Sequence, residues 1–563
     1  MPPPADMSTD SETTEVLPVR RSRWILLAAS AVLLPVVVLA LIEASLRLAG
    51  VGFSTDLLVP CTVKGTPAWC YNLFFATPYF PAGMVQTPRL YSIPVRKAPG
   101  TFRIFVLGES AAMGDPDSGY GFSRYVEVML RRRFPAMRFE VVNTGSVAIN
   151  SHVVLRIAEG LKNQQPDVFI IYSGNNEVVG PYGPGTVLTS VGMRLPVVRS
   201  SILLRSTRIG QLVTRLGTKK KEWRGMQLFL DNQVRANSPL MERTYRNYDQ
   251  NLRDTIAVAQ KSGAKVIVAT VATNQKDCAP FASLHRQGLG QDDLRSWSAL
   301  VLQGGEQERA KNYLQALNSY SSAAKIDAEY AELEFRIARS LWNLGDYKSA
   351  KDHFARARDL DTLRFRADGK INDINRSAAS WFAGVGLVDA EKVLADASPD
   401  GIIGSDLVYE HVHMTPEGNY LLARALFLQI AGGLPSRAAH ATDSDAPSEA
   451  DCERLLALTR YDRARLGAEM LNRLEEPPFT NQLNHSEQLL RLAVKAQPGD
   501  ESPDDTARQY QWAIAQDPDD GMLHLHFGTF LFRYNRMAAA EQLSLAQPWD
   551  GYPIFLPDGR QIR

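Results

Sequence analysis

Between Thr101 and Ala282, apolar residues come in short runs, and amphipathic stretches separate the first three of these runs. The runs predict buried parallel strands at 102–108, 139–145, 167–174 and 264–272, and a fifth, 384–390, follows after a long interruption. Helical spacing of apolar positions marks 123–134 and 152–164. This alternation predicts an α/β fold: a three-layer, doubly wound (flavodoxin-like) parallel sheet with helices on both faces.

The longest apolar run lies near the N-terminus, from Trp24 to Ile42, and contains no charged residue. At ~1.5 Å per helical residue it spans roughly 28 Å, enough for a hydrocarbon core. Arginines 20, 21 and 23 precede it and only Arg47 follows closely, which predicts a single-pass anchor with the N-terminus in the cytoplasm and the residues beyond about 45 outside it. A cleaved signal peptide is the alternative, although such segments are normally shorter and no clear A-x-A cleavage site follows.

The interruption before the fifth run has a helical pattern of its own. Over 331–361, small and aromatic residues fall at the offsets of a tetratricopeptide repeat, and 307–326 supplies a preceding helix. The matching positions are Ala338, Gly345, Tyr347, Ala350, Phe354 and Ala357. A poorer match near the C-terminus has Tyr510, Ala513 and Pro518 closing one repeat and Gly528, Asn535 and Ala540 in the next. Since an array normally needs about three repeats, we expect the inserted piece to lean on the catalytic domain, with 307–366 beside the active-site rim.

These patterns divide the chain into an N-terminal anchor, a split catalytic domain and two helical regions. The predicted parts are a disordered cytoplasmic tail (1–19), a transmembrane anchor (20–48), an extracytoplasmic linker region (49–100), the first part of the catalytic domain (101–290), a tetratricopeptide-like helical insertion (291–380), the final part of the catalytic domain (381–434), a polar linker (435–450) and a C-terminal tetratricopeptide-like region (451–563).

Charge and cysteine usage exclude several classes of function. With 62 basic and 61 acidic residues the net charge is +1, which offers no electrostatic footprint for nucleic acid. The four cysteines form no pair or Cys/His cluster with zinc spacing, so we expect no metal and no other cofactor. An oxidising compartment would favour a Cys61–Cys70 disulfide; two free, partly buried thiols are the alternative, and the sequence leaves both open.

Polar residues and glycines follow several of the predicted strands. The first strand runs into Gly108-Glu109-Ser110, the second ends in Asn143-Thr144-Gly145, and the third ends in Gly174-Asn175-Asn176-Glu177. Far downstream stands Glu410-His411-Val412-His413. Because the carboxyl ends of parallel strands meet at one edge of the sheet, we expect these groups to converge there.

This set of motifs resembles the SGNH (GDSL-type) serine hydrolase family over about 101–200, 245–285 and 384–430. The resemblance implies that Ser110 is the nucleophile, in GES rather than GDS, and that the Ser110 and Gly145 amides and the Asn176 side chain form the oxyanion hole. It also implies that His413 is the base and Glu410, in place of the usual Asp, its orienting acid. A serine hydroxyl is a weak nucleophile and needs such a base within hydrogen-bond reach.

Other residues compete for these roles. His411 lies two positions from His413 but has no acid three residues before it, and Asp406 could replace Glu410 as the orienter. An isolated His285 is more often structural than part of a pocket. Lys219-Lys220-Lys221 could meet anionic lipid, but a short basic run is usually a solvated face.

The sequence therefore predicts a membrane-anchored extracytoplasmic ester hydrolase that acts through a Ser110 acyl-enzyme on lipid or carbohydrate esters. O-acyl transfer to an envelope polysaccharide is the first alternative. The second is an inactive scaffold that binds a protein partner through its repeats. A long apolar groove above Ser110 would favour lipid acyl chains, and a shallow polar pocket would favour acetylated sugars.

Overall fold

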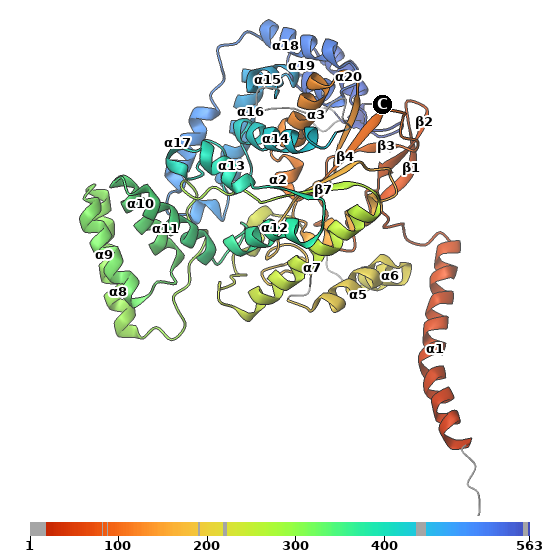
Figure 1. Cartoon of the computed structure of the whole chain (residues 1–563), viewed down its shortest axis with the longest axis horizontal. Coiled ribbons are helices and arrows are strands. Elements are labelled where there is room, and N and C mark those ends of the chain that lie inside the picture. The colour runs from red at the N-terminus through yellow and green to blue at the C-terminus, as the bar shows by residue number, and fades with distance from the viewer. Residues whose placement is uncertain are drawn as a thin grey trace, which may run out of the picture. The chain divides into compact units, whose positions relative to one another are not determined.

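The computed structural model describes residues 19–81, 83–86, 88–189, 192–217, 222–434, 446–555 and 561–562 (Figure 1). The predicted N-terminal tail, Lys219-Lys220-Lys221 and most of the 435–450 linker lie outside these residues. The chain forms two units, one of residues 1–54 and 203–218 and the other of residues 55–202 and 219–563.

A five-stranded parallel sheet lies at the centre of the larger unit, and it contains all five predicted strands. In the order β5–β4–β6–β7–β8, the strands are Arg138–Asn143, Thr101–Gly108, Val168–Tyr172, Lys265–Ala269 and Val385–Val388. Every residue of β6 is buried, as expected for a central strand whose two faces are both covered. The protein is thus an α/β protein with a parallel sheet.

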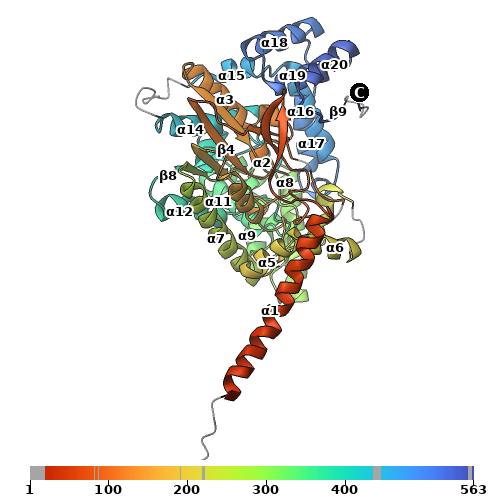
Figure 2. The ribbon, with the colours of Figure 1, turned by 90° about the vertical axis from the view of Figure 1, so that its right-hand side faces the viewer.

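Helices cover both faces of the sheet (Figures 1 and 2). On one face α3 (Phe122–Arg133) packs on α14 (Pro416–Ala431), which also contacts α13 (Ala390–Ala397). On the other face lie α4 (Ser151–Leu161), α7 (Pro239–Lys261) and α12 (Gly369–Trp381). The amphipathic stretches predicted at 123–134 and 152–164 correspond to α3 and α4 within three residues at each end.

Four helices fill the chain between β7 and α12, and they form one packed group (Figure 1). They are α8 (Gln291–Arg309), α9 (Tyr313–Ile326), α10 (Ala331–Asn343) and α11 (Tyr347–Leu360). Ala338, Ala350, Phe354 and Ala357 share a small core with Ala279 and Ile402, which belong to the rest of the unit. The inserted helices therefore pack against the rest of the larger unit.

The C-terminal region is also helical, and its helices α18, α19 and α20 lie together in both views (Figures 1 and 2). Its elements are α15 (Glu449–Leu455), α16 (Arg460–Leu474), η5 (Phe479–Asn481), α17 (His485–Lys495), α18 (Pro503–Gln516), α19 (Gly521–Leu531), α20 (Arg536–Leu545), and the strand pair β9 (Ile554–Phe555) and β10 (Gln561–Ile562). Ion pairs join this region to the sheet domain: Arg465 binds Asp117 at 2.5 Å, and Arg124 binds Asp520.

The stretch expected to be a linker, 49–100, instead contains a small antiparallel sheet. Its strands are β1 (Leu58–Val63), β2 (Thr66–Tyr71) and β3 (Ser92–Pro94). Cys61 and Cys70 form a disulfide across the β1–β2 hairpin. Cys278 and Cys452 are free and buried. Prolines and exposed polar residues in these short strands hide the alternation that marks a strand in the sequence.

The smaller unit contains α1 (Val19–Leu48), α6 (Arg208–Gly217) and the end of α5 (Leu195–Ser206). Among the described residues, α1 is the one helix long and apolar enough to cross a membrane, through Ala29–Leu48 with a mean hydropathy of 2.3. Its apolar side chains in this stretch are unburied. A signal sequence near an N-terminus has the same properties.

Candidate active site

Ser110 lies in the turn that joins β4 to the short helix α2 (Ser110–Met113). Gly108 makes this turn with φ +156, and a Cβ at that position would lie 2.0 Å from the backbone oxygen of Tyr172. Only glycine fits so close an approach. Ser110 is the first residue of α2, so its backbone amide belongs to the helix end whose amides have no partner within the helix.

His413 and Glu410 come to Ser110 from the turn before α14. The His413 Nε2 atom lies 2.9 Å from Ser110 Oγ, and the His413 Nδ1 atom is hydrogen-bonded to Glu410 Oε1. All three side chains are buried, and Glu410 is wholly so. The structure therefore brings nucleophile, base and acid of the sequence prediction into one relay, in the order that the roles require.

The turn itself is held by the same carboxylate. Glu410 Oε2 accepts a hydrogen bond from the Val412 amide at 3.0 Å and another from the His411 amide. The Tyr409 amide donates to the His413 carbonyl at 2.8 Å. Glu410 thus fixes both the backbone that carries His413 and the orientation of the imidazole ring.

The surroundings shift the pKa values of the two histidines in opposite directions, upward for His413 and downward for His411. Burial lowers the pKa of His413, but the Glu410 and Asp115 carboxylates outweigh burial and hold it above its usual range. Burial lowers the pKa of His411, and here it prevails over the attraction of Glu410. The pKa of Glu410 lies well below its usual value despite burial, because His411 and His413 stabilise the charge. Glu410 is therefore ionised across the neutral range.

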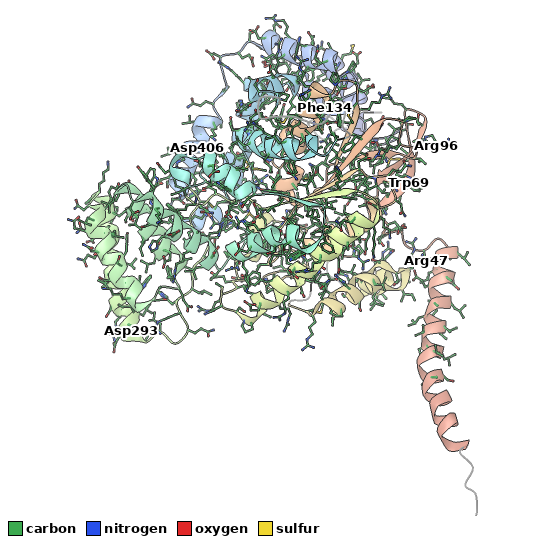
Figure 3. The ribbon with its side chains drawn as sticks, in the orientation of Figure 1. Arg47, Trp69, Arg96, Phe134, Asp293 and Asp406 are labelled. Carbon is green, nitrogen blue, oxygen red and sulfur yellow. A yellow bond between two sulfur atoms is a disulfide. The ribbon has the colours of Figure 1, made fainter. Side chains whose placement is uncertain are left out.

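The competing residues occupy other places. His411 faces Phe281 and Phe479, with ring centroids 5.5 and 5.7 Å away, and its Nδ1 lies beside Glu410 without hydrogen-bond geometry. Asp406 is exposed at the surface (Figure 3), and its backbone oxygen accepts a hydrogen bond from Thr415. His285 lies outside the pocket and binds Asp327 at 2.8 Å.

Asp115 is a second carboxylate at the base, and the sequence analysis missed it. Its Oδ2 atom lies 3.1 Å from His413 Nε2, the same nitrogen that faces Ser110. Arg473, from α16 of the C-terminal region, binds Asp115 through both guanidinium nitrogens at 2.7 and 3.1 Å. Asp115 follows Gly114 in the nucleophile turn, but no motif in the sequence links it to Arg473, far downstream.

We expect Asp115→Asn to shift the pH dependence of kcat/KM. If His413 is the base, it must be neutral to act, so activity should fall as the pH falls through the His413 pKa. Asp115 raises that pKa, and its removal should move the acidic limb of the profile to lower pH. Hydrolysis of a soluble ester measured across the pH range would show it.

Asp117→Asn is the matched control, because Asp117 pairs with Arg465 and His526 rather than with the base. An acidic limb that stays in place in Asp115→Asn, or moves equally in Asp117→Asn, would contradict the electrostatic link between Asp115 and His413.

The predicted oxyanion donors differ in their surroundings and in whether they are already hydrogen-bonded. Asn176 lines the same pocket as Ser110 and His413 and is partly exposed. The Gly145 amide donates to Asn143 Oδ1 at 2.9 Å, while Asn143 Nδ2 bonds the Ala112 carbonyl and Ser123 Oγ, each at 2.8 Å. Gly145 would therefore have to share its amide proton between Asn143 and an oxyanion.

Two buried glutamates position the loop that carries Asn176. Glu109 accepts hydrogen bonds from Ser173 Oγ and the Gly174 amide at 2.9 Å and from the Asn175 amide at 3.1 Å. Glu177 accepts from the amide and hydroxyl of Ser151 at 2.8 Å. Burial raises the pKa of Glu109 to about 7 and, with the nearby Glu109 charge, that of Glu177 to about 8.

A cavity of about 490 Å³ opens beside Ser110. Its walls are mainly apolar, with aromatic and aliphatic side chains from five separate parts of the chain: Val147, Ala148, Val179, Trp223, Met226, Phe229, Phe365, Pro477 and Phe479. Polar groups at the cavity besides the relay and Asn176 are Gln86, Asp115, Arg224, His411, Arg473 and Glu476. The cavity therefore matches the apolar alternative of the sequence analysis better than a shallow polar one.

We expected residues 307–366 to lie beside the rim of the active site, but only the end of this range reaches the cavity. Of the range 307–366, the cavity wall contains Phe365, which lies beyond the inserted helices. The C-terminal region instead supplies the rim, through Arg473 and residues 476–479. A proline pair interrupts this segment, so no helical or strand pattern marks it in the sequence.

Glu410, His411 and His413 also place three possible metal-ligand atoms within 4.8 Å of one another. In this group Glu410 is already bonded to His413 and to two backbone amides. The Glu410 carboxylate is thus engaged in the hydrogen bonds that orient His413 and hold its turn.

Solved structures resemble this protein only weakly. No protein-family model and no curated protein matches the sequence. A lipase/acylhydrolase from Enterococcus faecalis is 11% identical over 60% of this chain and 100% of its own, with a TM-score of 0.26. A GDSL-like lipase from Bacteroides thetaiotaomicron is 11% identical over 59% and 89%, with a TM-score of 0.26. An α/β hydrolase from the Lake Arreo metagenome is 15% identical over 64% and 99%, with a TM-score of 0.27.

Proposed function

We propose that this protein is a membrane-anchored serine ester hydrolase of the SGNH type, which acts on esters with an apolar acyl group. The observation that carries the proposal is the relay from Ser110 Oγ through His413 to Glu410, at the carboxyl edge of a parallel sheet and beside an apolar cavity. The strand order β5–β4–β6–β7–β8 is that of the doubly wound flavodoxin-like fold, in which ligands bind at this edge.

The geometry supports a two-step acyl transfer. Ser110 Oγ attacks the ester carbonyl while His413 Nε2 takes its proton, and Glu410 stabilises the imidazolium through Nδ1. The Ser110 amide and the Asn176 side chain hold the oxyanion, with the Gly145 amide as a shared donor. His413 then returns the proton to the leaving alcohol, and a water molecule, activated in the same way, releases the acid.

Several finer features belong to this proposal. The helical group α8–α11 is tetratricopeptide-like, with Gly345 at φ +83 between α10 and α11 and small buried residues on both helices. The C-terminal helices α18–α20 are of the same kind, and either group could hold a protein partner. The α1 helix is the anchor, with the catalytic unit outside the cytoplasm, where a disulfide such as Cys61–Cys70 is stable.

A fluorophosphonate probe tests the nucleophile. The probe should label the full-length protein covalently and should fail to label Ser110→Ala, as measured by mass spectrometry of the labelled peptide. Ser146→Ala is the matched control, because Ser146 is a buried serine near the same sheet edge but outside the cavity wall. A protein that no probe labels, although it is folded, would favour the inactive scaffold instead.

The acyl preference follows from the cavity. Each methylene that enters an apolar cavity contributes up to about 0.8 kcal/mol, or about fourfold in kcat/KM if the contact persists in the transition state. We expect kcat/KM on p-nitrophenyl esters to rise from acetate to medium-length chains. A maximum at acetate would contradict an apolar acyl site. Faster transfer to an added sugar hydroxyl than to water would make O-acyl transfer the reaction.

A further inference from the structure

The α6 helix has an apolar face that is partly covered at Ile209 and Leu212 and open at Val213 and Leu216. Ile209, Leu212, Val213 and Leu216 follow the i, i+3, i+4, i+7 spacing, so they form one stripe on the helix. Val213 is 65% exposed and Leu216 is 90% exposed. Leu203 and Leu204, just before α6, are also about two-thirds exposed, at 64% and 65%.

This helix is tied to the end of α1. The Glu43 carboxylate accepts hydrogen bonds from the Arg208 and Ile209 amides at 3.0 and 3.1 Å, and so caps the N-terminus of α6. Gln211 exchanges two hydrogen bonds with the backbone of Phe53, at 2.9 and 3.1 Å. Gly52, at φ +77, allows this contact, because a Cβ there would lie 2.5 Å from Gln211 Oε1.

The attachment sets the level of α6 along α1. Glu43 is the first residue after the charge-free run that ends at Ile42, so the N-terminus of α6 is attached where the apolar run ends. Amphipathic helices that lie on a membrane bury their apolar face at the boundary between headgroups and acyl chains. The end of a membrane-spanning apolar run lies at this same boundary.

Charges on α6 fit the same surface. Arg215 is exposed and lies beside the apolar stripe, while Gln211 and Thr214 lie opposite it. Arginine side chains beside an apolar stripe can reach headgroup phosphates while their stems stay in contact with apolar surface. Exposed Leu41 and Ile42 on α1 supply apolar surface at the neighbouring level.

We propose that α6 lies in the membrane surface as a second membrane contact, with its apolar stripe among acyl chains and Arg215 at an anionic phospholipid headgroup. This inference rests on the membrane anchoring by α1 in the proposed function. It gives the catalytic unit two points of attachment to one leaflet, the spanning helix and a helix parallel to the surface.

Site-directed fluorescence on the full-length protein tests the position of α6. The variant Leu216→Cys carries an environment-sensitive label on the apolar stripe, and Thr214→Cys carries it on the opposite face. The natural free cysteines are buried and the other two form the disulfide. The protein is reconstituted in vesicles of phosphatidylcholine with phosphatidylglycerol, and quenching by acyl-chain nitroxide lipids is compared with quenching by aqueous iodide.

We expect the label at position 216 to shift its emission to shorter wavelength and to be quenched by nitroxide lipid but not by iodide. The label at 214 should be quenched mainly by iodide. Equal iodide quenching at both positions would overturn the proposal. The proposal would also be overturned if the label at 216 were protected from iodide only at high protein density and were not quenched by nitroxide lipid. A second copy of the chain would then cover the stripe. Release of the protein from the vesicles by alkaline carbonate would instead contradict the anchoring by α1, so this measurement distinguishes a failure of the anchor from a failure of the α6 contact.

Discussion

Replacement of His413 by Ala should lower ester hydrolysis by a factor on the order of 10⁴ to 10⁶, about as much as Ser110→Ala. The reason is the 2.9 Å contact between His413 Nε2 and Ser110 Oγ, which is the one path shown for the hydroxyl proton. Nucleophile and base act as a unit, so the double variant should be no slower than either single variant. Rates on a soluble short-chain ester, with folding checked by thermal melting, measure this.

His411→Ala is the matched control for this prediction. His411 is buried two residues away and lines the same cavity, but it makes no contact with Ser110 in the structure. It should keep most of the activity. If His411→Ala is inactive while His413→Ala remains active, the base has been assigned to the wrong histidine, and Glu410 loses its role as well.

The second large effect is expected for Glu410→Gln, a loss of about 10³ to 10⁴ in kcat. Glutamine keeps the shape but removes the negative charge that supports the imidazolium, and its amide group can donate to Nδ1 and so favour the wrong tautomer. Removal of the charge also lowers the His413 pKa, since Glu410 is the main group that raises it. The residual activity should therefore extend to lower pH than in the natural protein.

Glu410→Asp separates reach from charge. The natural carboxylate bonds His413 and two backbone amides at the same time. An aspartate is one methylene shorter and cannot keep both sets, so activity should fall although the charge remains. Full activity in Glu410→Asp would show that the turn adapts freely, and full activity in Glu410→Gln would remove Glu410 from the mechanism.

The sequence predicts the parts of the fold that repeat a local pattern. The five strands of the sheet are short, mainly apolar runs, and the polar residues after them come together because parallel strands share one carboxyl edge. That rule is enough to place Ser110 and Asn176 at one site, whereas His413, well beyond the last strand, is placed by the resemblance of its motif to the SGNH family. It also places Glu410, since an acid three residues before a histidine lies within reach of its ring.

Contacts that depend on long-range packing could not be predicted in this way. Nothing near Asp115 or Arg473 in the sequence indicates that the two side chains meet, because their contact depends on where α16 docks. The same holds for Phe479 in the cavity wall and for Asn143, whose side chain takes the Gly145 amide. The strands within 49–100 could not be predicted for a local reason, since they are short and contain prolines.

The order of the site residues along the chain has a consequence for the time at which the enzyme becomes active. Ser110 and His413 are 303 residues apart, and Asp115 and Arg473 are 358 apart. At about 5–20 residues per second, a ribosome needs roughly 15 to 60 s to make the chain between nucleophile and base. Throughout that interval Ser110 has no partner for the His413 contact. If the proposed function is correct, the growing polypeptide should have no esterase activity until His413 has been made and the turn before α14 has packed against Ser110.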